Sequence, residues 1–486
     1  MKLFHNLDKN AKEGGKRGKV SKEFMGSHYL LKSESAKRLY DSFASDQPIY
    51  DYHCHLDAKE ILENQHFTDI GELWLKGDHY KWRLMRAAGV PEEKITGNSV
   101  SYEDKFYAFA EVLPYFIGNP VYHWAHLELQ KFFGIHEALS AKTARKVYEQ
   151  TQEKMAVGGF SVRELIGRSK VEMIATTNHP KEELKWHQRL QESSNIATKV
   201  VPTFRPDAFL HIEWERFHTE VRDFGDQYGI DMQNLDDLLA LLMRRMDDFA
   251  TVGCRIADHG LTDFPAVKGS YSEAKAIFQK AMDRTEITFL DMQKYQYYLL
   301  YFLGSEYARR DWVMQLHMSP LRNTNTRIYH SLGPDAGVDS VGDPVSARAL
   351  QQWFDEVELA GGVPRTLLFT LNPSAYYVMA TMAGNYQGGV KGKIQVGPAW
   401  WMLDHRDGIE EQLRLVANTG GLGLFVGMTT DSRSYLSYAR HDYFRRILCS
   451  VIGEWIEGGE VPDDPVMVGD LIRGVSVENA RNYFRM

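Results

Sequence analysis

Residues 49–55 read IYDYHCH, an aromatic and β-branched run that ends in two histidines. Side chains two positions apart in a β-strand point to the same face, so a strand here would project His53 and His55 together. Cys54 would face the opposite way, into the core. A pair of hydrogen-bonded core histidines would show the same pattern, so the rest of the chain has to distinguish a core pair from a metal site.

Short apolar runs recur along the chain, and helical patterns separate most of them. A regular alternation of strands and helices predicts a parallel (β/α)8 TIM barrel. A doubly wound sheet is the alternative, but no Gly-x-Gly-x-x-Gly fingerprint follows the first run. The eight predicted strands are Ile49–His55, Val171–Thr177, Lys199–Arg205, Gly253–Asp258, Trp312–His317, Thr366–Asn372, Lys393–Gly397 and Leu424–Asp431.

The strands are unevenly spaced. The long stretch at about 60–170 is rich in aromatic residues and helix formers, and we expect a helical insertion over the C-terminal face of the barrel. Residues 258–311 predict a second helical excursion. Residues 1–24 are basic and poor in apolar side chains, which is typical of a disordered extension. The barrel domain should therefore span residues 25–486.

Composition excludes several classes of protein. The net charge of −8 disfavours a nucleic-acid reader or a membrane-surface protein. No apolar run approaches the roughly 18 residues of a membrane span. Three widely spaced cysteines argue against a disulfide framework and favour a reducing cytoplasm.

The C-terminal ends of barrel strands form the active-site face, which makes a metal site the better interpretation of His53 and His55. Asp431 closes the eighth predicted strand, which lies beside the first in a barrel. It is therefore a candidate metal ligand and general base, although a helix N-cap would also explain an Asp there. This donor set suits one divalent ion. We expect zinc, and manganese, iron or cobalt are compatible.

The pattern of His-x-His on the first strand and Asp after the last resembles the amidohydrolase superfamily. Its members often add a Lys or Glu on the fourth strand and His ligands on the fifth and sixth. Here the fifth predicted strand ends in His317, whereas the fourth lacks Lys or Glu and the sixth lacks His. We therefore expect a single metal, with His317 as a further ligand or a substrate contact.

Longer motifs resemble the uronate isomerase family over residues 25–486. They are DQPIYDYHCHL (46–56), WLKGDHYKWR (74–83), NPVYHW (119–124), FRPD (204–207) and FVGMTTDSRSYLSYARHDYFRRILC (425–449). The resemblance implies an aldose–ketose isomerase that interconverts D-glucuronate with D-fructuronate and D-galacturonate with D-tagaturonate. A small uronic acid would be its partner, and we expect a homo-oligomer.

The resemblance also implies residue roles. Asp431 would be the base that moves a proton between C2 and C1, with Tyr80 as the partner acid; a hydride shift is the alternative. His79 would contact the sugar. Arg205 and Arg433 would clamp the substrate carboxylate, because guanidinium binds carboxylate bidentately. A metal-dependent hydrolase of the same superfamily is the rival function, and the arginine pair favours the isomerase.

Overall fold

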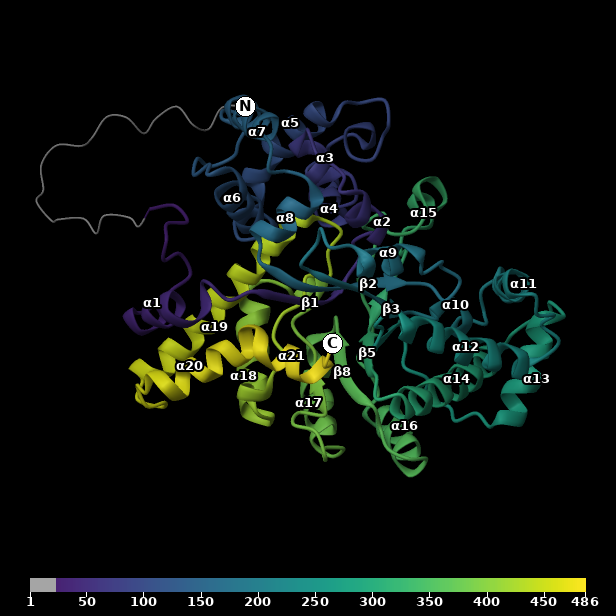
Figure 1. Ribbon diagram of the computed structural model, residues 1–486. Helices are drawn as coiled ribbons and strands as arrows, with labels where there is room; N and C mark the ends of the chain where they lie inside the picture. Colours follow the sequence, from purple (N-terminus) through teal and green to yellow (C-terminus); the bar gives the residue numbers. More distant parts are fainter. Residues whose placement is uncertain (1–22) are drawn as a thin grey trace, which may run out of the picture.

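The structure is a computed structural model that describes residues 23–486 (Figure 1). Most of the predicted N-terminal extension, residues 1–22, lies outside the described residues. In the described part of the chain, no helix is long and apolar enough to cross a membrane.

A curled parallel sheet of seven strands forms the centre of the described fold, in the order β1-β2-β3-β4-β5-β8-β9. Every neighbouring pair in this sheet is parallel, as alternating strands and helices predict. The strands are β1 (Ile49–Cys54), β2 (Val171–Asn178), β3 (Lys199–Phe204), β4 (Ile256–Leu261), β5 (Val313–Met318), β8 (Arg365–Thr370) and β9 (Ile394–Val396).

The segment Leu424–Asp431, predicted as the eighth strand, does not form a β-strand. It nevertheless lies where the eighth strand of a barrel would lie. The backbone N–H of Asp431 donates to the carbonyl of His53 at 3.1 Å, and that of Val426 donates to the side chain of Gln395 at 3.2 Å. The segment thus lies between β1 and β9 and completes the barrel. Gly427 prevents a regular ladder, because its φ of 75° is left-handed and a Cβ there would meet the carbonyl oxygen of Val475 at 2.0 Å.

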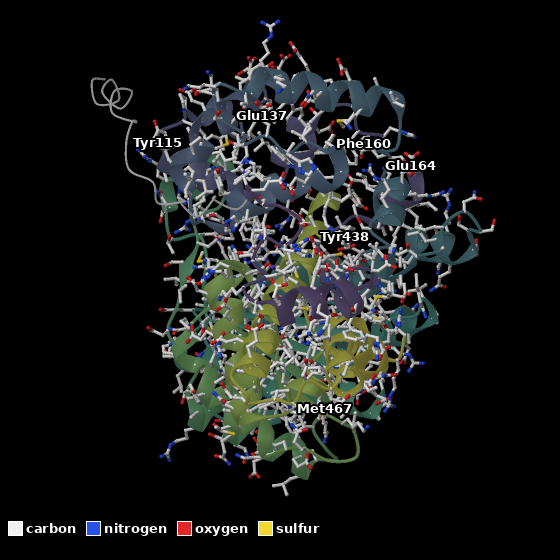
Figure 2. All side chains as sticks on the ribbon, turned by 90° about the vertical axis from the view of Figure 1, so that its left-hand side faces the viewer. Tyr115, Glu137, Phe160, Glu164, Tyr438 and Met467 are labelled. Carbon is white, nitrogen blue, oxygen red and sulfur yellow. The ribbon has the colours of Figure 1, made fainter. Side chains whose placement is uncertain are left out.

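Helices fill both long gaps between strands. The insertion after β1 packs above the C-terminal ends of the strands (Figure 1), and the side view in Figure 2 shows its residues Tyr115, Glu137, Phe160 and Glu164 at the opposite end from Met467. It contains α2 (Ala58–Glu63), α3 (Ile70–Leu75), α4 (His79–Ala87), η2 (Glu92–Lys94), α5 (Tyr102–Val112), η3 (Leu113–Phe116), α6 (Pro120–Phe133), α7 (Ala144–Val157) and α8 (Val162–Arg168).

The remaining helices lie outside this insertion, and most of them surround the barrel. Helix α12 shows how the sequence sets their limits, because Asn234 and Asp237 form a capping box at its start. These helices are α1 (Glu34–Leu39), η1 (Tyr40–Ala44), α9 (Lys185–Glu192), α10 (Asp207–Leu210), α11 (Phe217–Tyr228), α12 (Leu235–Thr251), α13 (Tyr271–Met282), α14 (Phe289–Arg309), α15 (Thr326–Leu332), α16 (Ala347–Leu359), η4 (Pro373–Ala375), α17 (Tyr376–Gly384), η5 (Trp401–Leu403), α18 (Arg406–Thr419), η6 (Leu422–Leu424), η7 (Tyr435–Tyr438), α19 (Ala439–Glu457), α20 (Pro465–Arg473), η8 (Gly474–Glu478) and α21 (Asn479–Phe484). Between β5 and α16, two short strands, β6 (Pro320–Leu321) and β7 (Ser340–Val341), pair antiparallel on either side of α15.

The end of the chain packs against the barrel interior. Phe484 is fully buried and stacks on Tyr52 of β1, with ring centroids 4.6 Å apart. It belongs to the same apolar cluster as Val201, Ile256 and Val313 from the sheet. The last helix therefore helps to hold β1, the strand that carries the two histidines.

Candidate active site

The two histidines of residues 49–55 lie together at the end of β1. His53 is the penultimate residue of the strand and His55 follows its last residue. Burial lowers the pKa of His55 to about 4, so its imidazole is neutral, as a metal ligand must be. Cys54 between them is buried, with its thiol against the carbonyl of Ala175, so it is a core residue as predicted.

Asp431 brings its carboxylate to both imidazoles. Its Oδ1 lies 3.2 Å from Nε2 of His53 and 3.1 Å from Nε2 of His55. Burial raises the pKa of this carboxyl, but hydrogen bonds with the two histidines outweigh burial and hold the pKa well below its ordinary value. The three predicted ligands thus converge, and they form one of two clusters of potential ligands in the described chain. Three such donors fit a divalent ion that keeps positions open for substrate.

The backbone at Asp431 is strained, with a left-handed φ of 46°. Such a conformation costs a non-glycine residue on the order of 1–3 kcal/mol and is typical of functional sites. The indole N–H of Trp400 donates to Oδ2 of Asp431 at 2.7 Å, which fixes the oxygen that faces away from the imidazoles. The next helix, η7, has Ser434 at its N-cap, so Asp431 does not cap it.

A fully buried carboxylate that was not predicted from the sequence, Asp258, also belongs to the site. Its Oδ1 lies 2.7 Å from Nδ1 of His317, and its Oδ2 lies 3.0 Å from Nη1 of Arg205 and 3.8 Å from Nδ1 of His53. Asp258, His53 and His317 form the second cluster of potential ligands. The predicted fourth strand ends at Asp258, whereas β4 continues to Leu261 and places this residue inside the barrel. An Asp within an apolar strand is the signal that would have identified it.

Three arginines line the cavity beside these groups. Arg205, at the end of β3, is held by Asp207 (2.9 Å) and Asp258. Arg433 lies 2.9 Å from Asp335. Arg322 was not predicted, because it lies in the irregular segment after β5; its guanidinium is 5.2 Å from the ring centre of Trp401. A cavity with three cations can bind an anionic ligand.

His79 and Tyr80 open α4, where Asp78 caps the helix by accepting from the backbone N–H of Tyr80. The ring of His79 packs edge-on against Trp401, with centroids 5.3 Å apart. The hydroxyl of Tyr80 is buried without a hydrogen-bond partner among the described residues. Burial raises the pKa of this phenol well above its ordinary value, so Tyr80 is a proton donor rather than a phenolate.

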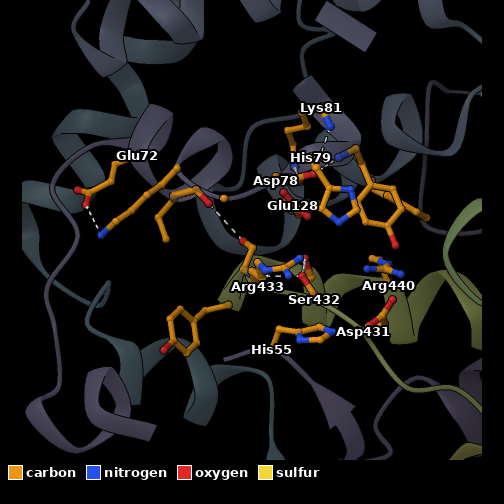
Figure 3. Close-up of a pocket in the computed structure, with 18 of the residues that line it drawn as sticks. His55, Glu72, Asp78, His79, Lys81, Glu128, Asp431, Ser432, Arg433 and Arg440 are labelled. Atoms are coloured by element: carbon orange, nitrogen blue, oxygen red, sulfur yellow. Dashed lines mark hydrogen bonds and ion pairs between the residues drawn. The ribbon is translucent and has the colours of Figure 1, made fainter. Parts of the chain in front are cut away.

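Two adjacent cavities meet at these residues. One, of about 260 Å³, is lined by His53, His317, Trp400 and the three arginines among others. The second, of about 230 Å³, extends under α4 and is lined by Tyr80. Both share His55, His79, Asp431 and Arg433, which Figure 3 shows around the second cavity. All eight predicted site residues therefore line one or both cavities, with Tyr80 in the second alone.

Another histidine, His126 on α6, has a structural role. The ring of His126 donates from Nδ1 to the carbonyl of Tyr122 at 2.6 Å and accepts at Nε2 from the backbone N–H of Leu139 at 2.8 Å. Both ring nitrogens are occupied, so this residue has no lone pair for a metal.

Comparisons with known proteins agree with this geometry. A family model described as glucuronate isomerase matches residues 21–484. The uronate isomerase of Caldanaerobacter subterraneus is 48% identical over 95% of this chain and 99% of its own. The uronate isomerase of Bacillus subtilis is 44% identical over 95% of this chain and 98% of its own. The crystal structure of the uronate isomerase from Thermotoga maritima superposes with a TM-score of 0.89 at 33% identity, covering 95% of this chain and 99% of that one.

Proposed function

The chain belongs to the glucuronate isomerase family and is a uronate isomerase, and we propose how its site carries out the reaction. The substrates are D-glucuronate and D-galacturonate, and the products are the ketoses D-fructuronate and D-tagaturonate. One observation supports this reaction above all. His53, His55 and Asp431 converge in one cavity, and three arginines line the same cavity. Such a site matches a sugar with a carbonyl at one end and a carboxylate at the other.

His53, His55 and Asp431 are the residues that would hold one divalent ion, for which zinc is our first expectation. When bound, the ion supplies an electrophile that polarises the carbonyl oxygen. Asp258 lies on the other side of the His53 ring, 3.8 Å from its Nδ1, so its negative charge faces this imidazole without a hydrogen bond, while Nε2 is directed at Asp431.

Asp431 is the proposed base. Its low pKa keeps it ionised, and the hydrogen bond from Trp400 fixes the carboxylate plane. It takes the proton from C2 and delivers it to C1, while a proton also moves from O2 to O1, and the two transfers together convert the aldose to the ketose. Tyr80 is the proposed acid for the sugar oxygens, since its hydroxyl is protonated and has no partner among the described residues. His79 and His317 are the proposed contacts of the sugar hydroxyls.

The carboxylate end of the sugar would lie toward Arg205 and Arg433, with Arg322 as an additional donor. A neutral sugar has no charge to pair with these cations, so we expect the site to favour uronic acids over ordinary aldoses.

We also place the enzyme in the cytoplasm, which is consistent with three free, buried cysteines. A homo-oligomer is the proposed assembly, and exposed apolar side chains such as Tyr115, Ile117 and Val157 offer surface for it.

Metal analysis combined with a product assay tests the proposal. The purified protein should hold one divalent ion per chain and form a ketouronate from each uronic acid. His55→Asn should lose both the ion and the activity, whereas His136→Asn, which changes an exposed histidine, should lose neither. If a metal-free His55→Asn protein still formed the ketose, the reaction would not require the metal ion. A protein that forms no ketose from either acid would refute the proposed function.

A further inference from the structure

The segment between β5 and α16 contributes Arg322 and Asp335 to the lining of the first cavity. It contains α15, which has no buried residue and stands apart from the barrel helices in Figure 1. Its base is nevertheless well fixed. The backbone N–H of Asn323 donates to Asp339 at 2.8 Å, and that of Thr324 donates to the carbonyl of Val338 at 2.9 Å.

Asp335 reaches from this segment to two of the cavity's arginines. Its Oδ2 lies 2.9 Å from Nη2 of Arg433, and its Oδ1 lies 3.6 Å from Nη1 of Arg322. One carboxylate therefore bridges two guanidinium groups. Burial raises its pKa, but Arg433 and Arg322 outweigh burial and lower it, so the group is an anion at neutral pH.

The third arginine is held quite differently. Arg205 pairs with Asp207 and with Asp258, and the latter is a fully buried barrel residue. By contrast, the side chain of Asp335 is 49% exposed. Ion pairs of exposed groups are weak, because water competes for both partners. Arg322 and Arg433 can therefore exchange their carboxylate, whereas Arg205 keeps its partners at Nε and Nη1 and has only its other N–H groups for the substrate.

We propose that Asp335 determines specificity: in the empty enzyme it occupies Arg322 and Arg433, two of the three arginines of the proposed carboxylate clamp, and it yields them to the carboxylate of the substrate. This inference rests on the proposed function of the site. A uronate replaces one carboxylate with another, so the two arginines never lose their counter-charge. A neutral aldose carries no group that can displace Asp335. A small anion, which lacks the sugar's other contacts, competes poorly.

Contacts behind Asp335 keep it near the clamp after the exchange. Arg86 donates to the carbonyl of Ala336, and Arg83 donates to the carbonyl of Asp339. Gly337 lies so close to the backbone of His79 that a Cβ there would come within 2.8 Å of its carbonyl oxygen. These anchors tie the loop to α4, so Asp335 can return when the product leaves.

Kinetics of Asp335→Asn test the inference, with Asp343→Asn as the matched control. Both variants remove one negative charge from the same segment, but no ion pair of Asp343 with either arginine is present in the described structure. Without the internal competitor, the KM for D-glucuronate should fall about threefold to tenfold, the range of one or two exposed ion pairs. The inhibition constant of acetate should fall by a similar factor. Asp335→Glu, which restores the charge, should return both constants toward wild type.

The outcomes separate the inference from the proposed function. Wild-type protein that makes no ketouronate refutes the function itself. If wild type turns over, an unchanged or raised KM in Asp335→Asn overturns the exchange, because the carboxylate would then support the clamp rather than compete for it. An equal fall of the KM in Asp343→Asn would overturn it as well, since the loss of any negative charge in the segment would then lower the KM.

Discussion

Replacing Arg205 with methionine should damage both the stability and the activity of the enzyme. The guanidinium lies 3.0 Å from the carboxylate of Asp258, a side chain with no exposed surface. Methionine fills much of the same space but leaves that carboxylate with histidine partners alone. Removing one partner of a buried ion pair costs about 3–5 kcal/mol, and we expect a loss of unfolding free energy in this range. The clamp loses a donor too, so kcat/KM should fall by about 30-fold to 1,000-fold, or 2–4 kcal/mol.

Urea unfolding and steady-state kinetics measure the two effects separately. In the double variant Arg205→Met/Asp258→Asn, the stranded charge is gone, so stability should partly recover while kcat/KM stays low. Arg216→Met is the matched control, because that arginine is exposed and its guanidinium lies 4.8 Å from the ring centre of Trp214, away from Asp258. Arg205→Met with wild-type stability would show that the buried pair does not hold Asp258. Wild-type kinetics in the folded variant would show that Arg205 does not bind the substrate carboxylate.

Three further substitutions test separate parts of the account. Asp431→Asn should stay folded, keep at least part of its metal and lose roughly 10²–10⁴ in kcat, the usual worth of general acid–base catalysis; activity within a few-fold of wild type would exclude it as the base. Burial lowers the pKa of His126 to about 4, below that of the unfolded chain, so protonation of the unfolded state destabilises the protein as pH falls from 6.5 to 4. His126→Gln should reduce this pH-dependent loss of unfolding free energy by up to about 3 kcal/mol, and an unchanged pH profile would show that the ring is not held neutral. Phe484→Ala should cost about 3–5 kcal/mol in chemical unfolding, because its ring is fully buried against Tyr52; a loss below 1 kcal/mol would mean that the chain end does not support β1.

Periodicity in the sequence predicts most of the barrel. Strand limits agree within a few residues for seven of the eight predicted strands, because buried parallel strands are short apolar runs with clear ends. The exception is the last segment. Its composition is that of a strand, but the left-handed backbone at Gly427 and Asp431 is imposed by tertiary contacts, which a local pattern does not record.

In the candidate site too, local sequence pattern predicts some residues, and tertiary contacts determine the others. His53, His55 and Asp431 follow from spacing within a strand and from the closure of a barrel, and the structure brings them together. Asp258 was missed because the fourth strand was compared only with a Lys or Glu pattern, and because β4 ends three residues later than predicted, which places Asp258 within the strand. Asp335 and Arg322 lie in an irregular segment without periodicity, so only the fold reveals that Asp335 meets both Arg322 and Arg433.

Turnover of D-glucuronate in heavy water tests the central claim most directly. NMR of the product reports both the ketose and the hydrogen at its C1 in one experiment. If Asp431 carries a proton from C2 to C1, the D-fructuronate formed should contain solvent deuterium at C1, because the carboxylate lies in a cavity open to exchange. Failure to form the ketose would contradict the assignment of the activity. Ketose that forms without deuterium at C1 would contradict the solvent-exchanging proton transfer proposed for this site.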